Sequence, residues 1–143
     1  MWLHNGVEIT EIDERYVAFV YIITNLTNNR KYIGKKLTKF SKSKVIKGKK
    51  KRLKIDSDWR TYWSSSEELK KDVEALGEHN FRREILHLCL SKGEASYIEA
   101  DEQFSQKVLL DNTFYNGIIN CKIHKTHVKH LWTNSVSNSS KSP

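Results

Sequence analysis

The sequence has few cysteines, almost no proline and no long hydrophobic run. Its 143 residues include two cysteines, Cys89 and Cys121, and a single proline at position 143. Two cysteines cannot form the disulfide framework of a small secreted protein, and they suit a reducing compartment. No apolar run approaches the ~18–20 residues that span a bilayer, and the N-terminus lacks the pattern of a signal peptide. We therefore expect one globular domain that acts in the cytoplasm and has no membrane partner.

Acidic residues are absent from two stretches of the chain. Residues 35–54 contain ten lysines and Arg52, and residues 121–143 contain four lysines. The remaining residues carry 10 basic and 17 acidic side chains, so two basic appendages on an acidic body bring the net charge to +8. A run of +11 without an acid repels itself unless an anion lies against it. The pattern favours a nucleic-acid partner over a merely solvated surface, with an anionic membrane as the competing polyanion.

The apolar residues predict an antiparallel hairpin early in the domain. Residues 16–23 form a β-branched and aromatic run, residues 24–30 a polar, asparagine-rich turn, and residues 31–34 a short second strand. The basic stretch 35–54 has little apolar periodicity and is interrupted by serines and Gly48. It is predicted to be a long, mobile basic loop.

Two helices and two further strands are predicted after this loop. Ser65 and Glu68 form a capping box at the start of the first helix, and Ser91 begins a second helix in the same way. Strands are predicted over residues 81–90 and 114–119. The expected fold is α/β, with a small mixed or antiparallel sheet flanked by helices in the order strand, strand, loop, helix, strand, helix, strand.

One face of the predicted hairpin gathers polar side chains if the turn has an even length. In that register paired positions sum to an odd number, so Tyr21 and Tyr32 share a face. Gly34 and Lys36 lie on the same face. Two phenols, a bare backbone and an ammonium group could hold a phosphate, although both tyrosines could instead be packed core aromatics.

Two glutamates one turn apart in the second helix are candidates for polar chemistry. Glu99 and Glu102 lie among apolar and aromatic residues, and a half-buried carboxylate is costly unless it is paired or bound to a metal. Either could also be a solvated helix residue. That alternative suits Glu102 better if Ile98 and Phe104 define the core.

The triplets Phe19-Val20-Tyr21 and Tyr32-Ile33-Gly34 resemble the signature of the GIY-YIG nuclease family. Phe19 stands where the family has glycine, and the second triplet is intact. The resemblance covers residues 16–120 and is similar to the small free-standing members found in phages and mobile elements, in which lysines and a long basic loop follow the second triplet. Further matching features follow in order: a helix ending in Gly77, Asn80-Phe81 opening a strand, a helix bearing Glu99, and Tyr115-Asn116.

The resemblance implies metal-dependent hydrolysis of DNA phosphodiesters. It implies that Tyr21 is the general base or orients the attacking water, and that Tyr32 hydrogen-bonds the scissile phosphate or assists the base. It implies that Glu99 binds one divalent ion, Mg²⁺ or Mn²⁺, with no small-molecule cofactor. Asn116 would fix the phosphate or brace the site, and Gly34 would let the strand approach the DNA backbone.

A tyrosine needs help to act as a base, because a phenol with a pKa near 10 is only about one part in a thousand ionised at pH 7. Arg60 is the candidate for the family's phosphate-stabilising arginine, and Tyr62 for the position that follows it. Lys35 or Lys36 could supply the positive charge instead. The residues expected to contact DNA are Gly34, Lys35, Lys36, Lys49, Lys50, Lys51 and Arg52.

The segment 121–143 is predicted to be a basic tail on a nuclease domain over residues 1–120, disordered from Ser135. It holds four possible zinc ligands: Cys121, His124, His127 and His130. Their spacing is tighter than in structural zinc sites, and phosphate contact is the alternative. The sequence leaves three function classes open: a DNA endonuclease acting as a monomer or transient dimer, a catalytically inactive DNA- or RNA-binding module, and an RNA- or ribosome-associated basic protein.

Overall fold

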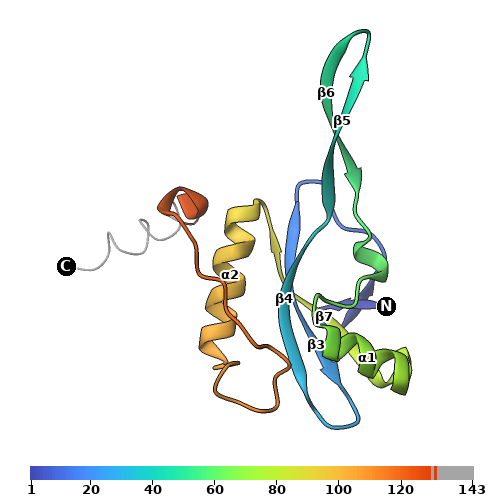
Figure 1. Ribbon diagram of the computed structural model, residues 1–143, viewed down its shortest axis with the longest axis vertical. Helices are drawn as coiled ribbons and strands as arrows, with labels where there is room; N and C mark the ends of the chain where they lie inside the picture. Colours follow the sequence, from blue (N-terminus) through green and yellow to red (C-terminus); the bar gives the residue numbers. More distant parts are fainter. Residues whose placement is uncertain (130, 132–143) are drawn as a thin grey trace, which may run out of the picture.

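A five-stranded sheet lies at the centre of the computed structural model, which describes residues 1–129 and 131 (Figure 1). Its strands are β1 (Trp2–His4), β2 (Val7–Ile9), β3 (Ala18–Asn25), β4 (Lys31–Leu37) and β7 (Phe81–Cys89). They are ordered β2-β1-β7-β3-β4. β1 and β7 run parallel and the other neighbours run antiparallel, so the predicted α/β class with a mixed sheet is confirmed.

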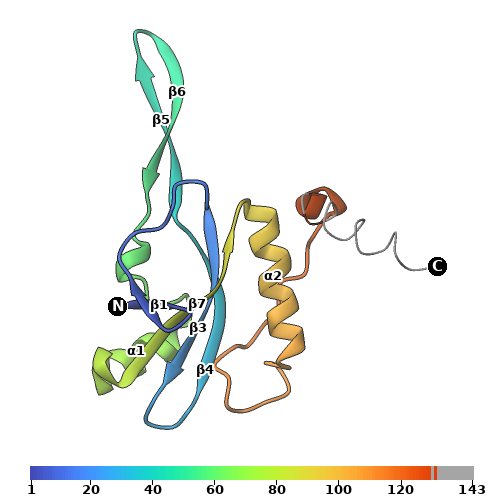
Figure 2. The ribbon, with the colours of Figure 1, turned by 180° about the vertical axis from the view of Figure 1, so that it is seen from behind.

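Helices cover both faces of this sheet (Figures 1 and 2). The first face carries α1 (Glu67–Leu76) and the short helices η1 (Trp59–Thr61) and η2 (Glu78–Asn80). The opposite face carries α2 (Lys92–Ser105), with η3 (Lys125–Val128) beside it. Within the described residues, no helix is long and apolar enough to cross a membrane.

Alternate residues of β3 supply two separate core clusters. Phe19 and Tyr21 pack in one cluster with Leu69 of α1. Val20 packs in the other with Ala95 of α2. Because β3 is buried on both faces, it has the continuous apolar sequence of a central strand rather than an alternating one.

The predicted hairpin of β3 and β4 is confirmed together with its register. Tyr21 pairs with Gly34 and Ile23 with Tyr32, so paired positions sum to an odd number. Tyr21, Tyr32 and Gly34 therefore share one face of the sheet, as does Lys36. This is the face that α1 and η1 cover.

The predicted capping of the two helices is right for α2 and one residue early for α1. The Oγ of Ser91 accepts a hydrogen bond from the amide of Glu94 at 3.0 Å. In α1 the N-cap is Ser66 rather than Ser65, because the Oγ of Ser66 accepts from the Leu69 amide at 3.2 Å. The shift by one residue leaves the Ser65 hydroxyl available for another contact.

The two ends of the domain differ from the prediction. β1 and β2 are three-residue strands in the polar lead, too short for a recognisable alternation, and they are held through the pairing of β1 with distant β7. The predicted strand over 114–119 is wrong. Of that segment only Phe114 makes a bridge, with Lys31, among the residues described.

The basic segment 35–54 is not a loop, which corrects the prediction. β4 runs on to Leu37, and β5 (Lys39–Ile46) and β6 (Lys49–Asp56) then form an antiparallel hairpin of their own. It projects beyond the rest of the molecule at the top of Figures 1 and 2. Lys47 and Gly48 at its tip have φ angles of 51° and 75°, as a two-residue type I′ turn requires. The two-residue turn and the pairing of β5 with β6 form this hairpin, although its sequence has no apolar periodicity.

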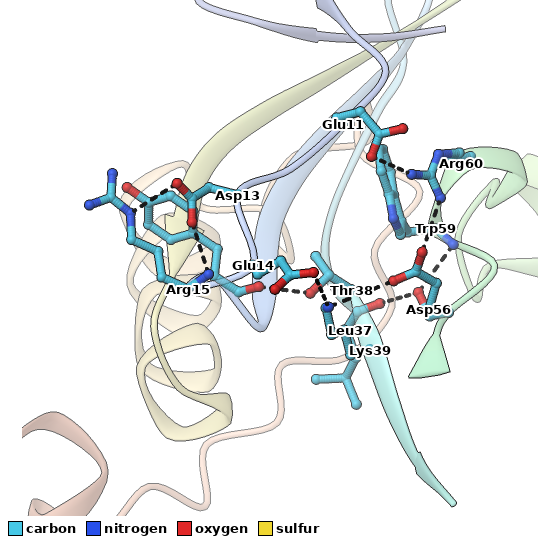
Figure 3. A network of polar contacts seen from close by, with 12 residues as sticks. Glu11, Asp13, Glu14, Arg15, Leu37, Thr38, Lys39, Asp56, Trp59 and Arg60 are labelled. Atoms are coloured by element: carbon cyan, nitrogen blue, oxygen red, sulfur yellow. Dashed lines mark hydrogen bonds and ion pairs between the residues drawn. The ribbon is translucent and has the colours of Figure 1, made fainter. Parts of the chain in front are cut away.

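Backbone and hydroxyl contacts fix the root of the β5–β6 hairpin (Figure 3). The Thr38 amide donates to the Val17 carbonyl at 2.9 Å, and the Ser57 amide donates to the Thr38 carbonyl at 2.9 Å. The Ser57 hydroxyl donates to the Leu37 carbonyl at 2.6 Å. Thr38 and Ser57 are both buried. The hairpin is thereby tied to the end of β4.

Candidate active site

Three tyrosines meet on the face of the sheet at Gly34. The ring of Tyr21, which is fully buried, lies 6.2 Å from that of Tyr32 and 6.1 Å from that of Tyr62, centre to centre. Tyr62 is also close enough to Tyr21 to raise the pKa of its phenol. A Cβ atom on Gly34 would lie 2.5 Å from the Tyr21 Oη and 2.8 Å from a ring carbon of Tyr32. Glycine is therefore required here to make room for the phenols, a reason that the sequence interpretation did not contain.

The phenols of Tyr21 and Tyr32 resist ionisation. Burial raises the pKa of Tyr21 well above its ordinary value, and the neighbouring Tyr62, Tyr32 and Glu99 raise it further. The pKa of Tyr32 is also raised, chiefly by burial and also by Glu99, although its hydrogen bond with Ser65 works in the opposite direction. Both side chains are neutral hydroxyl groups at neutral pH. The prediction that Tyr21 needs outside help to act as a base is strengthened.

Glu99 brings a carboxylate to this group from α2, on the other side of the β4 edge. Burial raises its pKa, while the ammonium group and a backbone hydrogen bond of Lys35 lower it. Glu99 raises the pKa of both Tyr21 and Tyr32, which places its charge close to both phenols. Glu99 thus acts electrostatically on Tyr21 and Tyr32, the two tyrosines with which the sequence prediction groups it.

Glu102 has a different environment from Glu99. Its Oε1 is 2.9 Å from the Nε2 of His87, and its Oε2 accepts a hydrogen bond from Gln106 at 3.0 Å. These contacts satisfy the carboxylate within the protein. Of the two helical glutamates, Glu99 is the one whose charge raises the pKa of Tyr21 and Tyr32.

Asn116 and Gln103 hold β4 in place directly before Gly34. The Oδ1 of Asn116 accepts from the Ile33 amide at 3.0 Å, and its Nδ2 donates to the Ile33 carbonyl at 2.8 Å. The Nε2 of Gln103 donates to the same carbonyl at 3.0 Å. Asn116 thus holds β4 as a neighbouring strand would, although its own segment forms no strand. Whether it braces a catalytic site or contacts the phosphate stays a prediction. Gln103 was missed, although its position four residues after Glu99 places it on the same helix face.

Lys36 is the cation that packs against the tyrosines. Its Nζ lies 4.0 Å from the centre of the Tyr62 ring and 2.6 Å from the Oδ1 of Asp58. The Lys36 side chain is only 11% exposed, whereas that of Asp58 is 63% exposed. Lys35, the other lysine considered, donates from its Nζ to the Ser96 Oγ at 2.6 Å. The two lysines thus flank Gly34 from opposite faces of β4, Lys36 beside the tyrosines and Lys35 beside α2.

Arg60 is not brought to the tyrosines. Its guanidinium group donates to the Thr10 carbonyl at 3.1 Å and to the Glu11 carboxylate at 3.0 Å. It also lies 3.9 Å from the carboxylate of Asp56, the last residue of β6 (Figure 3). Arg60 therefore belongs to the root of the β5–β6 hairpin, and its predicted contact with the phosphate finds no support in this placement. Its partner Glu11 is 49 residues away in the sequence, so local sequence patterns could not predict this contact.

Two residues that the sequence interpretation did not assign position the tyrosines. The Ser65 Oγ and the Tyr32 Oη share a hydrogen bond of 3.0 Å. Arg83 is buried between Trp2 and Trp63, and its Nη1 donates to the Tyr62 carbonyl at 2.8 Å. Burial lowers the pKa of Arg83 to about 10, so the group stays charged at neutral pH.

The predicted zinc ligands of the tail remain a prediction. The ring nitrogens Nδ1 of His124 and His127 accept backbone hydrogen bonds from Thr126 and His124, at 3.1 Å each. Cys121 is exposed. His130 and the segment from Ser135 lie outside the described residues. Within the described residues, no group of three or more His, Cys, Asp or Glu side chains could hold a metal ion.

Comparison with known proteins identifies the domain. Residues 2–119 match the family model "Putative endonuclease segE, GIY-YIG domain". Searches among curated proteins and among solved structures gave no match. The matched region contains both tyrosine triplets, Glu99 and Asn116, and spans most of the 143 residues. The chain belongs to the GIY-YIG endonuclease family, which indicates a nuclease-type function.

Proposed function

We propose that this protein is a DNA endonuclease that hydrolyses phosphodiester bonds with one divalent metal ion. The observation that carries the proposal is the meeting of the Glu99 carboxylate with the phenols of Tyr21 and Tyr32 around the bare backbone of Gly34. A carboxylate and neutral hydroxyl groups near the Gly34 backbone suit a phosphate, a bound cation and an attacking water.

The residues present fit a magnesium ion with one protein ligand. Glu99 is a partly buried carboxylate whose pKa is raised by burial, although Lys35 acts in the opposite direction. Mg²⁺ prefers hard oxygen ligands and keeps several waters, so one carboxylate and substrate phosphate oxygens suffice. Mn²⁺ accepts the same ligands. When bound, such an ion would acidify a water molecule and offset charge that develops on the phosphate.

The tyrosines act in this proposal as neutral hydroxyl groups. Tyr21 orients the attacking water, since burial disfavours its phenolate. Tyr32, which Ser65 holds in place, donates to the scissile phosphate. Asn116 acts indirectly, by fixing the backbone on which Gly34 lies. No small-molecule cofactor takes part.

Lys36 is the residue that stabilises the phosphate charge in this proposal. It lies against Tyr62, whose ring centre is 6.1 Å from that of Tyr21. Its present partner Asp58 is largely exposed and can be displaced toward solvent when a phosphate binds. Arg60 is already engaged by Glu11 and Asp56.

A second candidate function is a catalytically inactive module that binds nucleic acid. The placement of Arg60 at the hairpin root favours it, because the position expected to supply the family's arginine supplies none to the tyrosines. The basic surface would then bind DNA without cutting it. One experiment separates the two functions.

The test is nicking of supercoiled plasmid with Mg²⁺, with Mn²⁺ and with a chelator. The informative pair of variants is Glu99→Gln and Glu102→Gln, two glutamates of the same helix that differ in their surroundings. Loss of about 100-fold or more in Glu99→Gln, with Glu102→Gln close to wild type, supports the proposal. Nicking that survives Glu99→Gln would overturn the metal site. Absent nicking by the wild type, with plasmid binding intact, would establish the inactive module.

A further inference from the structure

The β5–β6 hairpin is basic on both of its faces. Side chains alternate along β6, so Lys49 and Lys51 lie on one face, and Lys50, Arg52 and Lys54 on the other. Every residue of β6 is exposed, and no other layer of the molecule covers it (Figures 1 and 2). Among the described residues, none of these five cations makes an ion pair. On both faces of the hairpin, the cations of β6 therefore have no acidic partner among the described residues.

This distribution differs from that of a basic patch that lies flat on DNA. A flat patch needs cations on one side only. A two-stranded hairpin is marginally stable by itself, and like charges on one face weaken it further. Charge on both faces is matched by a groove of duplex DNA, whose two walls are both lined by phosphates.

The dimensions of the hairpin select the groove. A two-stranded ribbon with side chains on both faces is about 10 Å thick, the spacing at which sheets pack. The major groove of B-DNA is about 12 Å wide and admits such a ribbon, whereas the minor groove is about 6 Å wide. The five cations of β6 lie within the six residues 49–54, which at about 3.4 Å each extend roughly 20 Å, the length of about six base pairs.

The hairpin leaves the body next to the tyrosines. β5 follows β4 after one residue, and β4 carries Tyr32 and Gly34. The Nζ of Lys36 lies 5.1 Å from the centre of the Phe40 ring and 4.0 Å from that of Tyr62, so one side chain contacts both the hairpin and the site. With its root fixed at Thr38 and Ser57, the hairpin has a defined direction from the site.

We infer that the β5–β6 hairpin lies in the major groove of the duplex that the site cleaves and reads its sequence there through Arg52. This inference rests on the proposed function, because it takes duplex DNA as the substrate. Arg52 is the one arginine among the nine cations of residues 39–56, the other eight being lysines. A guanidinium group can donate two hydrogen bonds to the O6 and N7 of guanine, whereas a lysine acts as a point charge.

The surroundings of Arg52 suit this role. Its cross-strand partner is Ser43, a small residue that leaves the face next to the guanidinium group open. The consecutive lysines Lys49, Lys50 and Lys51 precede it toward the tip and point to alternate faces. These lysines can contact the phosphates of both groove walls, while the longer, forked side chain of Arg52 reaches from its face of the ribbon toward the base edges.

The test is a binding selection carried out without cleavage. A pool of 30-base-pair duplexes with random sequence is bound in a chelator, and the bound fraction is sequenced. The wild type is expected to enrich a motif of about six base pairs that contains a conserved guanine. Arg52→Lys keeps the charge and is expected to lose the preference at that guanine by about 5- to 100-fold, with little change in binding to the unselected pool. The matched control is Arg82→Lys, an exposed arginine of the body that is paired with Glu84.

Each further outcome decides the inference. Absence of any enriched motif, or an Arg52→Lys variant that selects the same motif as wild type, would overturn it. Protection of guanine N7 from dimethyl sulfate in the complex supports major-groove binding, and protection of adenine N3 instead would overturn it. Because these measurements contain no divalent ion, a chain that selects sequence but does not nick plasmid loses the proposed function alone. A chain that nicks without selecting sequence loses only the inference on the hairpin.

Discussion

The cations of the body, meaning the described residues outside 39–56, differ from those of the β5–β6 hairpin in whether they form ion pairs. In the body, ion pairs join Arg30 with Glu68 at 2.7 Å and Lys36 with Asp58 at 2.6 Å. Between Phe40 and Ile55 the described residues form no ion pair, and the sequence has no acid between Glu14 and Asp56. Several cations of the body thus form ion pairs within the fold, whereas the described cations between Phe40 and Ile55 form none. Substitutions in the body should therefore affect catalysis or stability, and substitutions in the hairpin should affect DNA binding.

The largest expected effect is a loss of catalysis, without loss of DNA binding, when Glu99 in the body is substituted. Glu99→Gln should lower nicking by about 100-fold or more because it removes the negative charge beside both phenols. Its affinity for duplex DNA in a chelator should stay within about 2-fold of wild type. A large loss of DNA affinity in this variant would contradict the division between body and hairpin.

The second effect belongs to the hairpin and concerns affinity alone. Replacing Lys49, Lys50 and Lys51 by glutamine should make the salt slope of DNA binding shallower by about 2.7, since three phosphate contacts are lost. The affinity deficit relative to wild type should then be about 40-fold larger at 50 mM than at 200 mM salt. Thermal stability should not fall, because none of the three lysines has an ion-pair partner among the described residues and their mutual repulsion is removed. An unchanged salt slope would show that the hairpin does not carry the binding.

A third effect concerns the stability of the body. Asn116→Ala leaves the buried amide of Ile33 without its partner, which costs about 1–3 kcal/mol. Unfolding in urea should report this loss, and nicking should fall with it because β4 carries Tyr32 and Gly34. Asn28→Ala, in the exposed turn between β3 and β4, is the comparison variant. If Asn116→Ala kept full stability and lost only activity, Asn116 would contact the phosphate directly instead.

The smallest effect is expected for Arg60, at the boundary between the two regions. Its partners are exposed, so Arg60→Gln should change stability by at most about 1 kcal/mol. Nicking should remain within about 3-fold of wild type. A loss of 100-fold or more with intact DNA binding would restore Arg60 as the family's phosphate-stabilising arginine and displace Lys36 from that role.

Sequence reasoning reached much of the site because several of its signals are local. The parity of the β3–β4 turn was enough to place Tyr21 and Tyr32 on one face with Gly34. Two glutamates one turn apart could not be separated in that way. Their difference depends on His87 from β7, which binds Glu102 and leaves Glu99 to the tyrosines.

The β5–β6 hairpin could not be predicted, because its sequence lacks the alternation of apolar and polar residues that indicates a strand. Lysines and serines occupy most positions of β5 and β6, so apolar and polar residues do not alternate. Gly48, which the sequence analysis treats as an interruption, forms the turn together with Lys47. Arg60 was misplaced for a related reason, since its contacts run to Glu11 and Thr10, which only folding brings near.

The sequence by itself determined the family, the register of the tyrosine hairpin and the separation of an acidic body from basic appendages. These features depend on residue identity and on the two-residue period of a strand, which act over short distances along the chain. The tertiary structure alone decided which glutamate and which cation accompany the tyrosines, and that the basic stretch is an ordered ribbon. Those outcomes depend on which side chains from distant segments contact one another in the folded protein. Short-range patterns along the chain do not specify these contacts.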